Sequence, residues 1–319
     1  MRAYCYQEGI GDFPFLKHPR IQWHYPLFRL KIHSASHPSN QPQNHPIHGQ
    51  NHHRKEILHV IMDTSPRIDA LTLIKEEGKL NPGSSRSFLP RFGDELIPKN
   101  PRLAVRDGDF QDNDILIGNN KNEGSFQLTT GNPDLFGFFG KKDTNISKAT
   151  AAELLNKIFR TFPNTDAVVN HYLPNNTDYT PRMQVADASG DFTLMCPTVF
   201  FAEKFAENNN SVYFYLFDHR PRNSPWAEWM GAVHFEEVQF VFGVPMQIPS
   251  RYRKIDRLLT RRMIEHWSNF AKNGKPKDSW PLYSKENPTV LYYNTAENQE
   301  EGIGPHKDNC DFFRPYFDM

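Results

Sequence analysis

The sequence predicts an α/β domain in which helices flank a mostly parallel sheet. Residues 114–118 form a short apolar run bounded by polar residues and a glycine, which is typical of a buried strand. Residues 212–217 are all apolar or aromatic and favour a central strand covered on both faces. Helical patterns lie between and after these runs, and strands that alternate with helices indicate parallel pairing.

Two segments carry clear helix signals. Thr150 and Glu153 have the spacing of a capping box, so we expect a helix to open there. Residues 255–273 repeat apolar side chains at helical spacing, and Gly274 then stops the helix. The apolar run at residues 238–242 is strand-like.

The bulk composition excludes several classes of protein. The 319 residues include 37 basic and 37 acidic side chains, so no charge excess attracts nucleic acid or an anionic membrane. No apolar run approaches the roughly 20 residues of a transmembrane segment. The first thirty residues also lack the apolar core of a signal peptide.

The composition changes near residue 87. Six histidines lie among Pro, Asn, Gln and Ser at residues 33–54, and such a tract either binds metal or is a disordered segment of low hydrophobicity. Irregular spacing favours disorder, so we expect residues 1–86 to be disordered, with short amphipathic helices at residues 56–78 broken at Pro66. Residues 87–319 are expected to form the folded domain.

Two polar loops follow the predicted strands and carry the candidate chemistry. The first includes Glu123, and the second, which begins at His219, includes His234. Reactive groups gather at the carboxyl ends of strands in open α/β sheets. An acid followed by a histidine on such loops suits acyl transfer, because an imidazole takes the proton of a hydroxyl nucleophile and a carboxylate holds that imidazole's tautomer. Taken singly, each residue is more often an ordinary surface side chain.

Four longer stretches resemble the carboxylesterase type-B family, which includes the cholinesterases. They read FLPRFGDELIP (residues 88–98), ILIGNNKNEGSFQL (115–128), GDFTLMCP (190–197) and HRPRNSPWAEWMGAVHFEEVQFVFGVPM (219–246). The resemblance covers about residues 87–319 and implies the C-terminal part of an α/β-hydrolase fold. It also implies hydrolysis of choline or related carboxylic esters without a cofactor or metal, and it is compatible with a homo-oligomer.

The resemblance suggests roles for six residues. Glu123 matches the acid of the catalytic triad and His234 matches the base. Glu237 matches a carboxylate of the network that orients them, although an ordinary charge is equally compatible. Phe126 matches an aromatic of the choline pocket, where a ring face attracts a quaternary ammonium, and core packing is the alternative. Trp226 and Trp229 match family tryptophans that we interpret as packing residues.

The cysteines and sequons fit an extracellular protein. By resemblance, Cys196 and Cys310 form a family disulfide, and Cys5 stays unpaired. Two free thiols are the alternative in a reducing compartment. Asn145, Asn175 and Asn209 begin N-glycosylation sequons at the positions where a secreted or cell-surface protein would carry glycans.

The sequence also departs from the family. No G-x-S-x-G occurs, the nearest string being GSSRS at residues 83–87, and no glycine-rich oxyanion loop is recognisable. We therefore expect an incomplete version of the domain that is inactive by itself. Gln127, Thr130 and Phe235 replace residue types that are common in acetylcholinesterases, which favours a broader carboxylesterase.

Two other interpretations compete with an esterase. One is a non-catalytic, neuroligin-like adhesion protein of the same fold, and the other is an inert truncated paralogue. Retention of both Glu123 and His234 favours the esterase, because a binding module has no chemical need for that pair.

Overall fold

The computed structural model describes residues 69–80, 92–174, 179–295 and 301–317. The chain divides into two units, residues 1–89 and 90–319. In the first unit, helix α2 (Ala70–Leu80) begins after Asp69, whose carboxylate accepts a 3.0 Å hydrogen bond from Thr72 N. The helix lies within and just beyond the range where we expected short amphipathic helices. The histidine-rich tract and Cys5, for which we stated expectations, lie outside the described residues.

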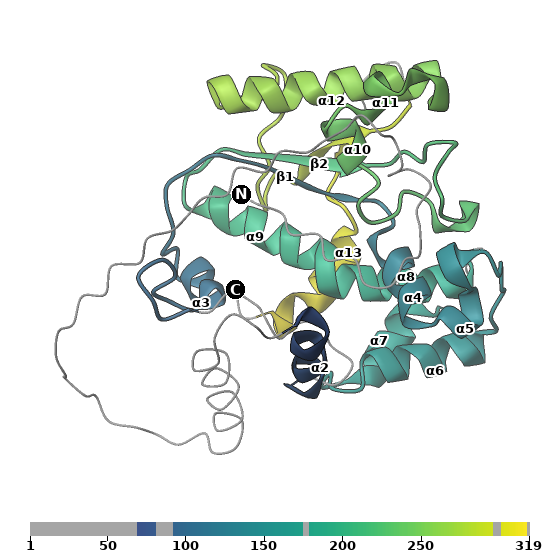
Figure 1. Ribbon diagram of the computed structural model, residues 1–319. Helices are drawn as coiled ribbons and strands as arrows, with labels where there is room; N and C mark the ends of the chain where they lie inside the picture. Colours follow the sequence, from purple (N-terminus) through teal and green to yellow (C-terminus); the bar gives the residue numbers. More distant parts are fainter. Residues whose placement is uncertain (1–68, 81–91, 175–178, 296–300, 318–319) are drawn as a thin grey trace, which may run out of the picture. The chain divides into compact units, whose positions relative to one another are not determined.

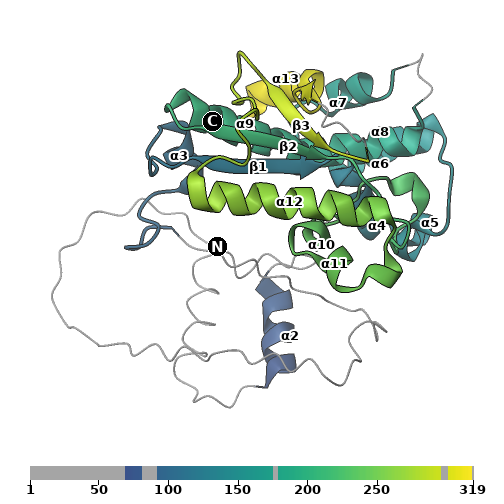
Figure 2. The same ribbon diagram turned by 90° about the horizontal axis from the view of Figure 1, so that it is seen from above.

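The second unit contains a four-stranded sheet in the order β1 (Ile115–Asn120), β2 (Val212–Phe217), β3 (Thr289–Tyr293) and β4 (Glu301–Ile303). The pairs β1–β2 and β2–β3 are parallel, and β4 pairs antiparallel with β3. Figure 2 shows β1, β2 and β3 side by side. The prediction of a mostly parallel sheet is confirmed.

Strand β2 is buried on both faces because its side chains alternate between two hydrophobic cores. Phe214 lies in one core with residues of α9 (Cys196–Glu207), and Tyr215 lies in the other with Leu259 of α12 (Lys254–Asn273). Figure 1 shows α12 on one side of the sheet and α9 on the other. This three-layer arrangement explains why every residue of β2 is apolar or aromatic.

The remaining helices of the second unit surround the sheet or build the edge that carries the polar loops. They are α3 (Pro101–Arg106), α4 (Glu123–Gly131), α5 (Pro133–Phe136), α6 (Lys148–Ile158), α7 (Thr165–Tyr172), α8 (Pro181–Gly190), α10 (Val238–Val241), α11 (Val244–Gln247) and α13 (Lys307–Phe313). A π-helical turn, η2 (Asp191–Met195), joins α8 to α9.

Two local predictions were wrong, and one was confirmed. Helix α6 begins after Ser147, whose hydroxyl accepts a 3.1 Å hydrogen bond from Thr150 N, so Thr150 lies in the first turn. Residues 238–241 of the run that we expected to be strand-like form helix α10, in which Phe240 is buried, Val241 packs against the same core, and Val238 is exposed. Helix α12 ends as predicted, at Gly274 with φ 72°.

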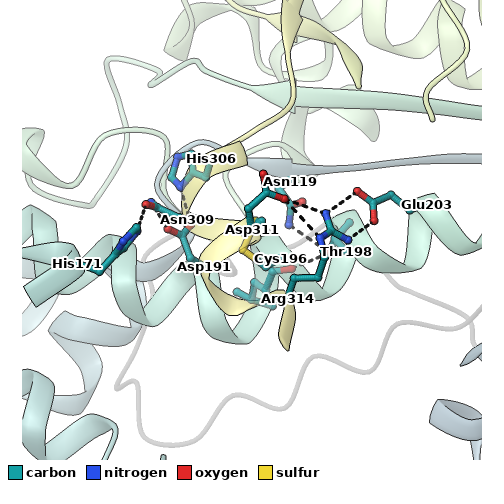
Figure 3. Close-up of a disulfide and its surroundings, with 12 residues drawn as sticks. Asn119, His171, Asp191, Cys196, Thr198, Glu203, His306, Asn309, Asp311 and Arg314 are labelled. Atoms are coloured by element: carbon teal, nitrogen blue, oxygen red, sulfur yellow. Dashed lines mark hydrogen bonds and ion pairs between the residues drawn. A yellow bond between two sulfur atoms is a disulfide. The ribbon is translucent and has the colours of Figure 1, made fainter. Parts of the chain in front are cut away.

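A disulfide joins the start of α9 to α13. Cys196 and Cys310 are bonded across a sequence separation of 114 residues, and both are fully buried, which confirms the predicted pair (Figure 3). In the chain-entropy model, a loop of that length stabilises the folded state by about 4–5 kcal/mol.

A buried carboxylate reinforces the same junction. Asp191 in η2 is 1% exposed, and its Oδ2 accepts hydrogen bonds from Tyr172 (2.8 Å) and Asn309 (2.7 Å). Its Oδ1 lies 2.5 Å from His306 Nδ1 (Figure 3). Burial opposes the charge of His306, but the Asp191 carboxylate outweighs burial and raises the pKa of His306 to about 9.

This ion pair makes the stability of the fold pH-dependent. Because the pKa of His306 is about 9 in the folded state and ordinarily 6.5, its stabilising contribution is complete below pH 6.5 and is lost as the pH rises through 9. Each pH unit in that window should remove up to about 1.4 kcal/mol of unfolding free energy. Chemical denaturation at several pH values measures the slope.

His306→Asn is the matched control for that measurement. Asparagine tolerates the left-handed backbone of His306 (φ 51°) and can donate to Asp191, but it does not titrate. The variant should have a lower unfolding free energy than the wild type below pH 6.5. Its unfolding free energy should not show the decrease that titration of His306 causes as the pH rises through 9. An equal fall in both proteins would assign the pH dependence to another group.

Candidate active site

The candidate site lies where β1 and β2 end at the same edge of the sheet. The loop after β1 leads directly into Glu123, the first residue of α4. The longer loop after β2 returns to this edge, where Val233 forms an isolated parallel bridge with Asn122. The Asn122 side-chain oxygen also accepts a 3.1 Å hydrogen bond from Ala232 N. These contacts place His234 beside Glu123.

The two predicted residues are in direct contact. His234 Nδ1 lies 2.6 Å from Glu123 Oε2, and Glu123 Oε1 accepts a 2.8 Å hydrogen bond from Asn120 N. Glu123 is buried, whereas the His234 side chain is 23% exposed. An ionised carboxylate can accept hydrogen bonds but cannot donate them. The proton of the neutral imidazole is therefore held on Nδ1, and Nε2 is left as a base.

Asn120 connects the remaining parts of the site. Its Nδ2 donates to Val233 O and to Glu237 Oε2, both at 2.6 Å. Burial raises the pKa of Glu237, and the hydrogen bond from Asn120 opposes that rise. Glu237 therefore reaches the pair through Asn120. We did not predict a role for Asn120. The signal that could have indicated one is an amide side chain at the carboxyl end of a predicted strand.

Two glycines permit the close approach of the site's elements. A Cβ on Gly124 would lie 1.7 Å from Ala186 O, so α4 and α8 could not pack at their present distance. Gly231 has φ 68°, and a Cβ there would lie 2.1 Å from Asn122 Oδ1. Substitution at Gly124 would push α4 away from α8, and substitution at Gly231 would push the two loops apart.

Aromatic side chains surround the imidazole. The Phe126 ring centroid lies 5.7 Å from that of His234, and the edge-to-face partner of Phe126 is Trp226 at 5.4 Å. Phe235 is nearer, at 4.1 Å from the His234 ring. Trp229 instead packs away from the pair, donating a 2.8 Å hydrogen bond from Nε1 to Gly140 O.

A second acid–histidine pair is structural. His219 Nε2 lies 2.7 Å from Asp256 Oδ1, and the two side chains are 4% and 0% exposed. Burial lowers the pKa of His219, although Asp256 opposes the shift. Asp256 Oδ2 also accepts a 2.7 Å hydrogen bond from Arg253 N at the start of α12. The pair anchors this helix and is not accessible to a reactant.

Other predicted features lie away from the pair. Asn145 and Asn209 are exposed, whereas Asn175 lies outside the described residues. Within the described ranges, no three His, Cys, Asp or Glu side chains are grouped to hold a metal ion. In that same part of the chain, no helix has the length and apolarity to cross a membrane.

The sheet topology and the carboxylate–histidine pair at its edge define an α/β hydrolase. The sequence model of the "Carboxylesterase family" matches residues 47–313. The chain therefore belongs to the carboxylesterase family. The match includes residues 47–86, which we had placed before the family-like part.

The similar proteins are cholinesterases. The chain is 33% identical over 275 residues to acetylcholinesterase-1 of Trittame loki. The aligned region covers 83% of this chain and 49% of that protein. It is 35% identical over 244 residues to acetylcholinesterase of Bungarus fasciatus (70% and 39%). It is 31% identical over 244 residues to cholinesterase of Mus musculus (73% and 40%). The chain thus spans half or less of the length of these relatives.

Replacing Glu123 tests how the imidazole is held. In Glu123→Gln, Oε1 can still accept from Asn120 N, so the amide NH₂ faces His234 Nδ1. The imidazole should then move its proton to Nε2 and lose its free base, which ¹⁵N NMR chemical shifts of His234 report. Loss of the charge-assisted hydrogen bond should cost about 1.5–3 kcal/mol of unfolding free energy.

Glu153→Gln is the matched control, because Glu153 is exposed on α6, far along the chain from the pair. It should leave both the tautomer and the stability unchanged. Retention of the Nδ1 proton in Glu123→Gln would contradict the assigned role of the carboxylate.

Proposed function

We propose that Glu123 and His234 are the acid and the base of a site that hydrolyses carboxylic esters through an acyl-enzyme. The observation that carries the proposal is the 2.6 Å contact between His234 Nδ1 and Glu123 Oε2 at the carboxyl edge of the sheet. In this chemistry the imidazole removes the proton of a serine hydroxyl as it attacks the ester carbonyl, and returns that proton to the leaving alcohol. The carboxylate steadies the imidazolium between those steps.

This polypeptide by itself is proposed to be inactive. The 319 residues contain no G-x-S-x-G motif, so the chemistry lacks its attacking atom. The backbone amides that stabilise the oxyanion come partly from the residue after that serine. Removal of a single oxyanion donor already costs about 100–1,000-fold in rate.

An ester assay tests this proposal. The purified chain should hydrolyse nitrophenyl acetate and acetylthiocholine no faster than its His234→Gln variant does. Turnover that disappears in His234→Gln would show that the chain holds a working nucleophile and would contradict inactivity.

Sequencing the complete transcript separates the esterase from the alternatives. A G-x-S-x-G elbow encoded upstream of residue 87 would support an esterase, and the product that contains it should lose ester hydrolysis in His234→Gln. A substituted elbow would support the neuroligin-like adhesion protein, and a stop codon would support the truncated paralogue. The intact Glu123–His234 contact favours the esterase over both.

The aromatic surroundings support an ester with a cationic or apolar alcohol group. Phe126 presents a ring beside His234 and Trp226 packs edge-to-face against Phe126, and a ring face attracts a quaternary ammonium by about 0.5–2 kcal/mol. Three relatives are named acetylcholinesterases. Gln127 stands where acetylcholinesterases commonly have another residue type, and its side chain is hydrogen-bonded to Thr193 and Ser189. A glutamine provides no aromatic ring at this position, which supports a range of esters wider than acetylcholine alone.

An extracellular or cell-surface location fits the same proposal. The disulfide between Cys196 and Cys310 suits an oxidising compartment. Asn145 and Asn209 are exposed and therefore accessible to glycosylation.

A further inference from the structure

Phe235 adopts a backbone conformation that is unfavourable for a phenylalanine. Its φ is 71°, in the left-handed region where glycine is favoured and a bulky residue is an outlier. The residue occupies the third position of a turn that the hydrogen bond from Glu236 N to Val233 O closes at 3.0 Å. A positive φ at the third position of a turn ordinarily selects glycine.

The two ends of this turn are held by other interactions. Val233 O also accepts from Asn120 Nδ2 at 2.6 Å. The Glu236 carboxylate is buried and accepts hydrogen bonds from Ser224 and Gln239 at 2.8 and 2.7 Å. The backbone therefore cannot relax around Phe235 without breaking contacts of the site.

Core burial does not compensate this strain, because Phe235 is 53% exposed. Its ring contacts the adjacent His234 imidazole, at 4.1 Å between ring centroids. Phe126 provides a second aromatic contact to the same imidazole at 5.7 Å. A strained residue whose ring contacts the reactive group indicates a role in the site.

We propose that Phe235 is a specificity-determining residue that shields His234 and limits the size of the group that reaches the imidazole. The inference rests on the proposed function and deepens it by assigning a preference for esters with a small leaving alcohol, because the imidazole returns its proton to that alcohol. A steric limit of this kind discriminates between ligands by about tenfold or more.

Acylation of His234 by pyrocarbonates tests the shield without ester turnover. The imidazole Nε2 attacks one carbonyl carbon and the bond to the bridging oxygen breaks. The acylated ring then releases its Nδ1 proton, and the departing carbonate monoester takes up a proton and decays to CO₂ and the alcohol. Diethyl pyrocarbonate is the small reagent and dibenzyl pyrocarbonate the large one. Mass spectrometry of the tryptic peptide 223–251, whose only histidine is His234, measures the rate.

His234 should be acylated faster in Phe235→Gly and Phe235→Ala than in the wild type. The ratio of the acylation rate with dibenzyl pyrocarbonate to that with diethyl pyrocarbonate should rise by about tenfold, or roughly 1.4 kcal/mol in relative activation free energy. Phe235→Leu keeps a bulky side chain and should stay slow. Phe242→Ala is the matched control, because Phe242 is 72% exposed and follows helix α10 as its C-cap, outside the turn. An unchanged ratio in Phe235→Gly, or a Phe235→Leu rate as high as that of Phe235→Ala, would overturn the proposal.

Thermal melting checks the strain separately. Because glycine accepts the left-handed region and alanine does not, Phe235→Gly should melt about 2–4 °C above Phe235→Ala. A lower melting temperature for the glycine variant would contradict the conformation on which the proposal depends. These readouts require no catalytic turnover of an ester, so they fail or succeed independently of an esterase activity.

Discussion

The candidate site depends on the pairing of two loops that are distant in sequence. Asn122 bridges Val233 through the backbone, and Asn120 donates to the carbonyl of the same Val233. Without these contacts, Glu123 would remain a buried carboxylate with no cation or donor opposite one of its oxygens. Because such an unpaired group is costly in a protein interior, the loop pairing and the Glu123–His234 contact stabilise each other.

The sheet supplies a rigid support for that pairing. Strand β2 is buried on both faces, so neither it nor the strand β1 beside it can shift without opening a hydrophobic core. On one side, the disulfide and the Asp191 hydrogen bonds join α9, η2 and α13. On the other, the buried His219–Asp256 pair anchors the start of α12. Polar interactions thus lock the helices that cover the sheet, while apolar contacts provide most of the burial.

Much of the fold was predictable from local patterns. The continuous apolar run of β2 and the helical spacing of α12 are long and unambiguous, and the structure has both where we expected them. The run at residues 238–242 is too short for its period to be read, and we predicted a strand where helix α10 forms. Whether a short apolar segment becomes a strand depends on a neighbour with free backbone groups, and local sequence does not report that neighbour.

The site shows the same division. The sequence by itself determined the two strands, the long helix and, through its motifs, that Glu123 and His234 belong together, because these features are encoded in residue type and short-range spacing. Only the tertiary structure decided that Asn120 links Glu237 to the pair, that His306 faces Asp191, and that Phe235 lies strained against the imidazole. Each of these results from contacts between residues about a hundred positions apart or from a turn held at both ends. Such contacts arise from packing, and periodicity along the chain carries no record of them.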